Sequence, residues 1–259
     1  MNLEYKIQKS IKFLQTISKK YNDLHLAFSG GKDSVVIYKL AELSGIDFKA
    51  FHNNTTIDPI GTIPFIKRNY PNVTIKNPKE SFYKLIERKG FPTRLNRYCC
   101  EYLKEYGSIG KNVIEGVRAD ESTKRSKRTE IFVDTRKNQK GAIHFYPILD
   151  WTDADVWLFI AKYDLPVAPA YHNGFNRLGC VGCPLVTRKG VRVEEFRREP
   201  KKYHAIKRAI DKGMRNNPQW KLTKLTKGNS DLAMEWWLSG KTMNEFNFNQ
   251  KLFDVPISL

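Results

Sequence analysis

The apolar positions in the first half of the chain follow two alternating patterns. Near the N-terminus they recur at helical spacing and predict an amphipathic helix before residue 22, through Leu3, Ile7, Ile11, Leu14 and Ile17. Beyond this helix, a short apolar run predicts a strand at 24–28, and the stretches at 48–54, 72–77 and 111–118 are predicted to be further strands. The segments between the runs have helical spacing and predict helices at 33–45, 62–70 and 80–90.

This alternation indicates the fold class. Strand–helix units of this length produce a mainly parallel, twisted sheet with helices on both faces, an α/β fold of the Rossmann-like type. After residues 144–166 the pattern changes to helix and loop, and we expect no further strand before the C-terminus. We therefore expect three consecutive segments: an N-terminal helix at 1–22, an α/β domain at 23–190 and a basic helical C-terminal extension at 191–259.

The composition is that of a globular protein. Hydrophobic residues make up 41% of the 259 residues, which is enough to form a sizeable core. The first 23 residues contain no uninterrupted apolar run, so we expect neither a signal peptide nor a membrane span. We therefore expect a cytoplasmic location, where reducing conditions favour free or metal-bound cysteines over disulfides.

The net charge of +18 bears on the class of partner. Two interpretations stay open: a solvated lysine-rich surface, or an anionic partner such as a nucleic acid or a polyanionic small molecule. Aromatic residues lie among the basic C-terminal positions and would be able to stack on bases, although packing in a core is their commoner role. These residues are Tyr203, Trp220, Trp236 and Trp237.

The clearest chemical motif is AFSGGKDSVV at residues 27–36. It follows a predicted strand and opens a predicted helix, which is the setting of a phosphate-binding loop. Ser29, Gly30 and Gly31 would let backbone amides approach an anion closely, and Lys32 would add a positive charge. The helix N-terminus adds a partial positive charge of its own. The alternative is a glycine-rich turn that binds no ligand.

The loop resembles the SGGxDS signature of the PP-loop superfamily, which has the adenine nucleotide alpha-hydrolase fold. The resemblance implies an adenine nucleotide bound by Ser29, Gly30, Gly31, Lys32, Asp33 and Ser34. It also implies catalytic roles for Lys32 and Asp33. Some members of the superfamily hydrolyse ATP between the α and β phosphates to adenylate an acceptor, and others bind adenylyl sulfates. ATP, accompanied by Mg²⁺, and adenylyl sulfate are therefore both expected candidates.

Three later segments resemble motifs of the phosphoadenosine phosphosulfate reductase family. EGVRADESTKR at 115–125 resembles G-x-R-x-x-E-S-x-x-R, YPILDWTDADVWLFI at 146–160 resembles PL-x-x-W-T-x-x-D-V-W, and PAYHNGFNRLGCVGCP at 169–184 resembles Y-x-x-G-x-x-R-x-G-C-x-x-C-P. The resemblance implies that Arg118, a catalytic candidate, and Arg125 hold phosphate or sulfate oxygens. Local pairing with Glu121 is the alternative for these arginines.

Two further stretches bear on the site, the helix start at Thr152 and the residues after the second predicted strand. Thr152 is expected to cap the helix that follows it, with Asp153 and Asp155 in the first turn, so that segment is structural. The stretch NNTTIDPIGTIPFI at 53–66 departs from the Asp-Thr-Gly start that the family has after its second strand. Asn53 and Thr55 are nevertheless expected to contact the nucleotide from this position.

The chain has four cysteines, an adjacent pair and a C-x-x-C pair: Cys99, Cys100, Cys180 and Cys183. Their order resembles the [4Fe-4S] ligand set of the iron-sulfur adenylyl-sulfate reductases, which implies one shared cluster. A structural zinc is the rival interpretation. Adjacent helix residues point about 100° apart, which makes convergence on a single ion awkward, whereas a cluster offers several iron corners. Buried thiols without a metal, or a redox dithiol at 180–183, also stay open.

The resemblance also has a gap. The reductases carry a further cysteine near the C-terminus, in a Glu-Cys-Gly-x-His segment, that attacks the sulfate sulfur. The 259 residues contain no fifth cysteine. Three functions therefore stay open: an oxidoreductase of sulfur metabolism acting on an adenylyl sulfate, an ATP-dependent sulfurtransferase that adenylates a nucleic acid such as tRNA or DNA, and a nucleotide-binding module without turnover. Either enzyme would need a redox or sulfur-donor protein as a partner.

Overall fold

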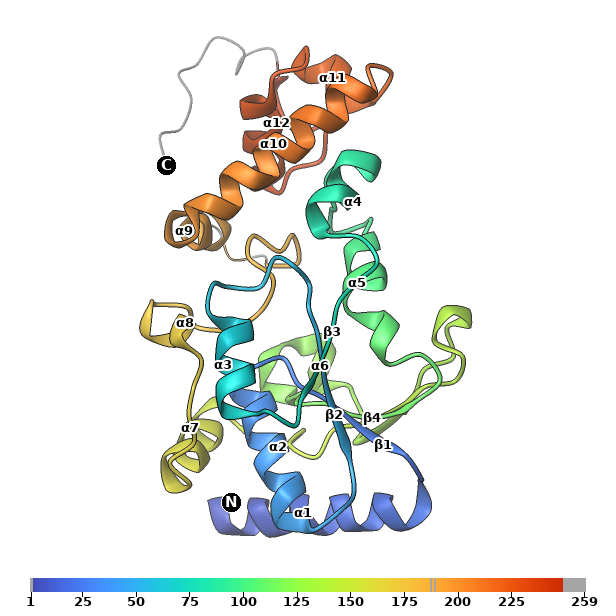
Figure 1. Cartoon of the computed structure of the whole chain (residues 1–259), viewed down its shortest axis with the longest axis vertical. Coiled ribbons are helices and arrows are strands. Elements are labelled where there is room, and N and C mark those ends of the chain that lie inside the picture. Colours follow the sequence, from blue (N-terminus) through green and yellow to red (C-terminus); the bar gives the residue numbers. More distant parts are fainter. Residues whose placement is uncertain (1, 187, 189, 249–259) are drawn as a thin grey trace. The chain divides into compact units, whose positions relative to one another are not determined.

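The computed structural model describes residues 2–186, 188 and 190–248 of the chain (Figure 1). Their contacts form two compact units. Unit 1 comprises residues 1–54, 60–77 and 105–178, and unit 2 comprises residues 55–59, 78–104 and 179–259. No helix among the described residues is long and apolar enough to cross a membrane.

Unit 1 is built on a six-stranded sheet with the strand order β3-β2-β1-β4-β6-β5. The strands are β1 (Leu24–Ala27), β2 (Lys49–Asn53), β3 (Thr74–Lys76), β4 (Asn112–Ile114), β5 (Ile131–Val133) and β6 (Ile143–Phe145). All neighbouring strands are parallel except β5, which runs antiparallel to β6 at the edge. The mainly parallel α/β fold predicted from the alternating pattern is confirmed.

Two parts of the strand prediction were wrong. β5 and β6 were not predicted, because each has only three residues and such a length carries no clear alternation of apolar and polar positions. The fourth strand was predicted at 111–118, but β4 ends at Ile114. Beyond β4 the chain crosses the first turn of helix α2 (Lys32–Ser44): a Cβ on Gly116 would lie 2.9 Å from the backbone of Asp33. This crossing brings residues 115–118 to the phosphate loop.

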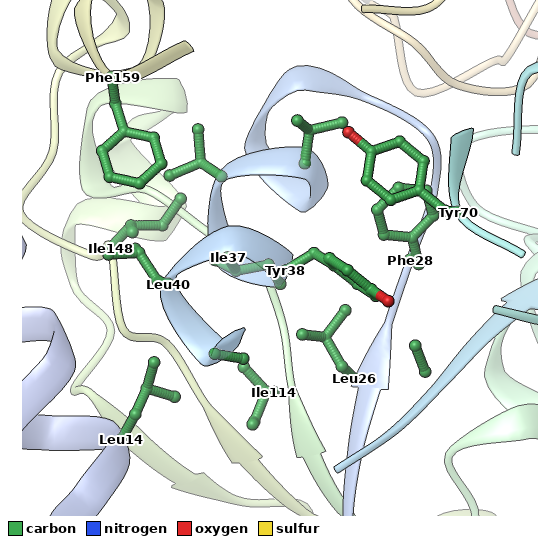
Figure 2. Close-up of a cluster of buried hydrophobic side chains, with 14 of the residues drawn as sticks. Leu14, Leu26, Phe28, Ile37, Tyr38, Leu40, Tyr70, Ile114, Ile148 and Phe159 are labelled. Carbon is green, nitrogen blue, oxygen red and sulfur yellow. The ribbon is translucent and has the colours of Figure 1, made fainter. Parts of the chain in front are cut away.

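The main core of unit 1 lies between one face of the sheet and three helices. These are α1 (Leu3–Lys20), α2 and α7 (Asp153–Lys162), which contact one another. Register places Leu26 beside Ile114, and Figure 2 shows both residues packed with Leu14, Ile37 and Leu40. Burial of these side chains, each worth roughly 1.5–3 kcal/mol, holds β1 and α2 rigidly on either side of the glycine-rich turn.

The other helices of unit 1 are short. They are α3 (Thr62–Asn69), α6 (Thr123–Ser126) and α8 (Pro169–His172), with 3₁₀ turns at Glu105–Gly107, Ala119–Glu121 and Lys137–Gln139. The second face of the sheet is more polar than the first, since register aligns His25, Val113, His144 and Phe132 across it.

Unit 2 is helical. It contains α4 (Phe82–Lys89), α5 (Tyr98–Leu103), α9 (Val191–Arg198), α10 (Pro200–Asn216), α11 (Lys221–Thr226) and α12 (Ser230–Ser239). α10 packs along α4 and also contacts α12. Trp237 of α12 stacks on Phe91 with ring centroids 4.6 Å apart, and its indole N–H donates to the carbonyl of Pro92 over 2.7 Å. These aromatic contacts join the last helices to the segment that precedes the adjacent cysteines.

The residue boundaries of the two units differ from those of the three consecutive segments predicted from the sequence. Residues 55–59 and 78–104 group with the C-terminal helices rather than with the sheet. The predicted division at 22 and 190 stays a prediction, and the last part of the predicted extension, residues 249–259, lies outside the described residues.

Candidate functional site

The predicted phosphate loop lies between β1 and α2 in unit 1. The Ser34 hydroxyl donates to the carbonyl of Gly31 over 2.7 Å, and the Gly31 amide donates to the Ser29 hydroxyl over 3.2 Å. Gly31 is the N-cap of α2 and offers no side-chain cap of its own. A backbone of this kind suits an incoming anion.

Tyr171 adds a contact that was not predicted. Its hydroxyl accepts a hydrogen bond from the Lys32 amide over 2.8 Å. Burial raises the pKa of Tyr171, so the side chain is a neutral phenol near pH 7. The tyrosine is part of the PAYHNGFNR stretch that carried the family resemblance, but nothing in the local pattern indicated that it would reach residue 32.

A network of five charged side chains lies beside the loop. Arg118 is 3% exposed, and its guanidinium donates to Asp33 over 2.6 Å, to Asp153 over 2.9 Å and to Asp120 over 3.3 Å. The Lys32 ammonium lies 3.0 Å from Asp153 and 3.2 Å from Asp33. The structure therefore brings together the three predicted catalytic residues, Lys32, Asp33 and Arg118.

Asp153 is the residue of this network that the sequence analysis missed as a site residue. Burial acts to raise its pKa, but the hydrogen bond from Lys32 and the charges of Lys32 and Arg118 outweigh burial, and the pKa lies below the usual range. The capping role predicted for Thr152 is confirmed, since its side chain accepts from the Asp155 amide. The same capped turn presents Asp153 to Lys32 and Arg118.

The predicted contact of Arg118 with an anionic ligand stays a prediction. Its Nε and both of its terminal nitrogens donate to carboxylates in this structure. Arg125 forms the ion pair with Glu121 that was the alternative to ligand binding. Burial, followed by the charges of Arg128 and Arg177, lowers the pKa of Arg125. Arg125, Arg128 and Arg177 therefore share one electrostatic environment. Arg128 and Arg177 were not among the arginines predicted to hold phosphate or sulfate oxygens.

The two residues expected to contact the nucleotide after β2 lie in different units. Asn53 ends β2 in unit 1 and packs against Gly107, where an added Cβ would lie 2.4 Å from its side-chain oxygen. Thr55 is buried in unit 2, where its hydroxyl hydrogen-bonds to the Cys180 thiol. The contacts of these two residues with a nucleotide remain predictions.

The four cysteines all lie in unit 2 and form no disulfide. Cys99 and Cys100 are on α5, and Cys180 and Cys183 are in the turn that precedes α9. A hydrogen bond from Cys99 lowers the pKa of Cys100 to about 6, with help from the charges of Lys104 and Arg97. The same bond raises the pKa of Cys99, as do burial and the charges of Cys100, Cys180 and Cys183. The four thiols therefore lie within electrostatic range of one another.

Positive charge accompanies these thiols. Burial raises the pKa of Cys180 to about 11, and the charge of Lys104 opposes this rise. In turn, the pKa of Lys104 is raised above its ordinary value by the charge of Cys180, and also by Asp58, Cys183 and Cys100. Within the described ranges, no group of three or more His, Cys, Asp or Glu side chains has the arrangement of a metal site.

Comparison with known proteins identifies the family. The model of the phosphoadenosine phosphosulfate reductase domain matches residues 23–186. The chain belongs to this family. The match includes the loop at 29–34, both predicted arginines and all four cysteines, and it ends before α9.

The relatives of this chain include both uncharacterized proteins and named reductases. The chain is 33% identical over 212 residues to an uncharacterized protein of Methanocaldococcus jannaschii, covering 74% of this chain and 51% of that protein. It is 20% identical over 211 residues to an adenosine 5'-phosphosulfate reductase of Burkholderia cepacia, covering 73% of this chain and 80% of that enzyme. The chain spans about half the length of the first of these relatives and 38% of a second uncharacterized protein of M. jannaschii.

Solved structures share the fold of the phosphoadenosine phosphosulfate reductase domain. A phosphoadenylyl-sulfate reductase of Candida auris superposes with a TM-score of 0.51 at 17% identity, covering 69% of this chain and 93% of that one. A Candida glabrata FMN adenylyltransferase solved with ATP gives a TM-score of 0.50 at 17% identity, covering 76% and 71%. At this identity the likeness concerns the fold alone.

Proposed function

We propose that this chain is a PP-loop enzyme of sulfur metabolism that binds an adenine nucleotide in unit 1 and carries a [4Fe-4S] cluster in unit 2. The observation that carries the first half is the charge network at the loop. Lys32, Asp33 and Arg118 come from segments 85 residues apart, yet they meet at the start of α2, where the N-cap residue supplies no side-chain cap. Family membership supports the same assignment.

The residues of the loop have distinct roles in this proposal. The amides of Gly30 and Gly31 and the N-terminus of α2 bind the phosphates, and the Lys32 ammonium moves from Asp153 towards a phosphate oxygen. Asp33 and Asp153 then hold Arg118 in place. Arg125 and Arg177 attract the anionic end of the nucleotide. With ATP, an acceptor oxygen would attack the α-phosphorus, the bond to the β-phosphate would break, and pyrophosphate would leave.

Lys32→Ala tests the nucleotide site. We expect the affinity for ATP or adenylyl sulfate to fall about 10- to 100-fold, because a charge-assisted hydrogen bond to phosphate is lost. Isothermal titration calorimetry measures the change. Lys39→Ala is the matched control, since Lys39 lies on the same helix and pairs with Glu42. Equal affinities of wild type and Lys32→Ala would remove the loop from the proposal.

The cluster proposal rests on the donor set of unit 2. Cys99, Cys100, Cys180 and Cys183 are all the cysteines of the chain, and they lie in one unit. The pKa of Cys100 is depressed while those of Cys99 and Cys180 are raised, so Cys100 is the residue that most readily supplies a thiolate, the form that binds metal. Lys104 and Arg97 place compensating positive charge near the thiolates, as a cluster with anionic ligands requires. A bound cluster would supply a redox centre.

Metal analysis tests the cluster directly. Protein purified without oxygen should contain about four irons per chain, with a broad absorption shoulder near about 400 nm. Cys100→Ser and Cys183→Ser should each reduce the iron content strongly, because each removes one ligand. Tyr102→Phe, on the same helix as Cys100, should leave it unchanged. A content of one zinc and no iron per chain would contradict the cluster proposal and would indicate a structural zinc site.

The nucleotide that the protein prefers distinguishes between two possible reactions. Tight binding of adenylyl sulfate would indicate a reductase-like oxidoreductase. If the four cysteines hold the cluster, the nucleophilic thiol of that reaction is not among these 259 residues, which contain no fifth cysteine. Pyrophosphate release from ATP with Mg²⁺ would indicate adenylation of an acceptor.

A second candidate function is ATP-dependent sulfur transfer to a nucleic acid. It is favoured by the surface of unit 2, where several basic side chains are exposed and form no ion pair within the described residues. They include Lys201, Arg208, Lys224 and Lys227. In this proposal these side chains contact backbone phosphates of the nucleic acid, and Cys99, Cys100, Cys180 and Cys183 hold the sulfur-handling centre.

Salt dependence tests the nucleic-acid candidate. Four phosphate contacts would make the affinity for tRNA fall about a hundredfold between 50 and 200 mM salt. The double variant Lys224→Ala, Lys227→Ala should bind more weakly and show a shallower dependence, whereas Lys162→Ala in unit 1 should behave as wild type. No binding to tRNA or DNA at 50 mM salt would leave these lysines as a solvated surface.

A further inference from the structure

The turn that carries Cys180 and Cys183 is fastened at the residue between them. The Gly182 amide donates to Glu195 over 2.7 Å, and the Gly182 carbonyl accepts from the Arg192 Nε over 3.0 Å. Both partners are on α9, three residues apart, so they share one face of the helix. The peptide groups on both sides of Gly182 are thus held by one rigid element.

Arg192 is in turn fixed by the last helix. It is 6% exposed, its Nη1 donates to the carbonyl of Trp237 over 2.6 Å, and its guanidinium lies 4.4 Å from the centroid of the Trp237 ring. Trp237 is itself stacked on Phe91 and bonded to Pro92. A planar guanidinium with donors in several directions suits this position, and an ammonium group would not reproduce it.

One side-chain nitrogen of Arg192 donates no hydrogen bond to a described residue. Its Nη2 is buried and has no hydrogen-bond partner among the described residues. An unused buried donor on a charged group is unfavourable unless an acceptor completes it. Two groups that can carry negative charge lie near this guanidinium, Cys183 and Glu195. Glu195 accepts from the Gly182 amide, and the Arg192 Nε bonds the carbonyl that is joined to the Cys183 amide, so Cys183 is the neighbour that we assign to Nη2. The charge of Cys183 also counters the effect of burial, which lowers the pKa of Arg192 to about 10.

We propose that Arg192 is a positioning residue for the metal site, holding the Cys180–Cys183 turn through Gly182 and donating its remaining N–H to the sulfur of Cys183. The inference rests on the proposed metal site, which it deepens by assigning the role of α9 and α12. Both helices lie outside the matched family region at 23–186. In this proposal the C-terminal helices support the cysteines from outside the matched region.

The test compares Arg192→Met and Arg192→Lys with wild type, all purified without oxygen. Arg197→Met is the matched control, because Arg197 is on α9 but exposed and paired with Glu194. Loss of metal to a chelator should be about tenfold faster in Arg192→Met, as for other residues that support metal ligands. Arg192→Lys should lose metal at an intermediate rate, and Arg197→Met at the wild-type rate.

A second readout separates this role from general loosening of the fold. In the fraction of Arg192→Met that retains iron, the cluster should become about tenfold harder to reduce, a shift of about 59 mV to lower potential for one electron. Arg192→Lys keeps the positive charge and should keep a potential near that of wild type. The potential thus reports the charge at Cys183, and the chelator rate reports the fastening of the turn.

The results that would overturn the role of Arg192 differ from those that would overturn the proposed cluster. Wild-type metal retention and potential in Arg192→Met would overturn the inference and leave the cluster standing. If Arg192→Met does not fold, Arg192→Lys decides through the chelator rate, and a wild-type rate overturns the inference. Zinc in place of iron would overturn the cluster, and equal rates of zinc loss from wild type and variant would then overturn the inference. A wild-type protein without either metal overturns both.

Discussion

Arg118→Met is expected to lower the free energy of unfolding of unit 1 by about 3 kcal/mol and to abolish nucleotide binding. The substitution keeps the apolar stem but removes the charge that compensates Asp33, Asp120 and Asp153. Lys32 alone then compensates Asp33 and Asp153, and Asp120 loses its ion pair. Because two of these carboxylates are about half exposed, we expect a loss at the lower end of the range for buried ion pairs. Urea denaturation followed by circular dichroism measures it.

The dependence on pH provides an internal check of this prediction. The pKa of Asp153 is depressed in the folded chain, so its contribution to stability is present above its ordinary value of 3.8 and is lost as the pH falls through the folded pKa. The stability difference between wild type and Arg118→Met should therefore shrink below about pH 4. Arg68→Met, an exposed substitution on α3, should change stability by less than about 0.5 kcal/mol. A small effect of Arg118→Met at pH 7 would show that the network contributes little.

Gly182→Ala should disrupt the cysteine turn and the metal site together. Gly182 has φ +69°, and a Cβ there would lie 2.2 Å from a ring carbon of Phe196. We expect a loss of about 2 to 4 kcal/mol in the free energy of unfolding from the strained backbone and the collision combined. The metal content of protein purified without oxygen should fall as well, because Cys180 and Cys183 can no longer keep their spacing.

Gly190→Ala separates the two contributions. Gly190 also has a positive φ, +81°, but nothing lies within 4 Å of an added Cβ. This control should therefore lose only about 1 kcal/mol, the cost of a left-handed backbone for alanine, and keep its metal. If Gly182→Ala were no more harmful than Gly190→Ala, the packing of Phe196 against the turn would not constrain the cysteines.

Local patterns were sufficient for several features of this chain. The spacing of Ile7, Leu14 and Ile17 predicted α1, and all three are buried. The glycine-rich turn was correctly placed between a strand and a helix, and the Thr152 cap was correct. These features depend on interactions between residues that are close along the chain. Composition and periodicity are therefore sufficient to predict them. The family motifs are equally local, and the family they indicated is confirmed.

Only the tertiary structure decided how these pieces combine. The partners of Arg118 come from α2 and from the start of α7, and Tyr171 reaches Lys32 across 139 residues. Thr55 hydrogen-bonds to the Cys180 thiol, and α9 and α12 hold the Gly182 peptide. β5 and β6 are too short to leave a periodic signal of their own. Such contacts depend on which surfaces meet when the apolar faces are buried, and that information is not contained in any single segment.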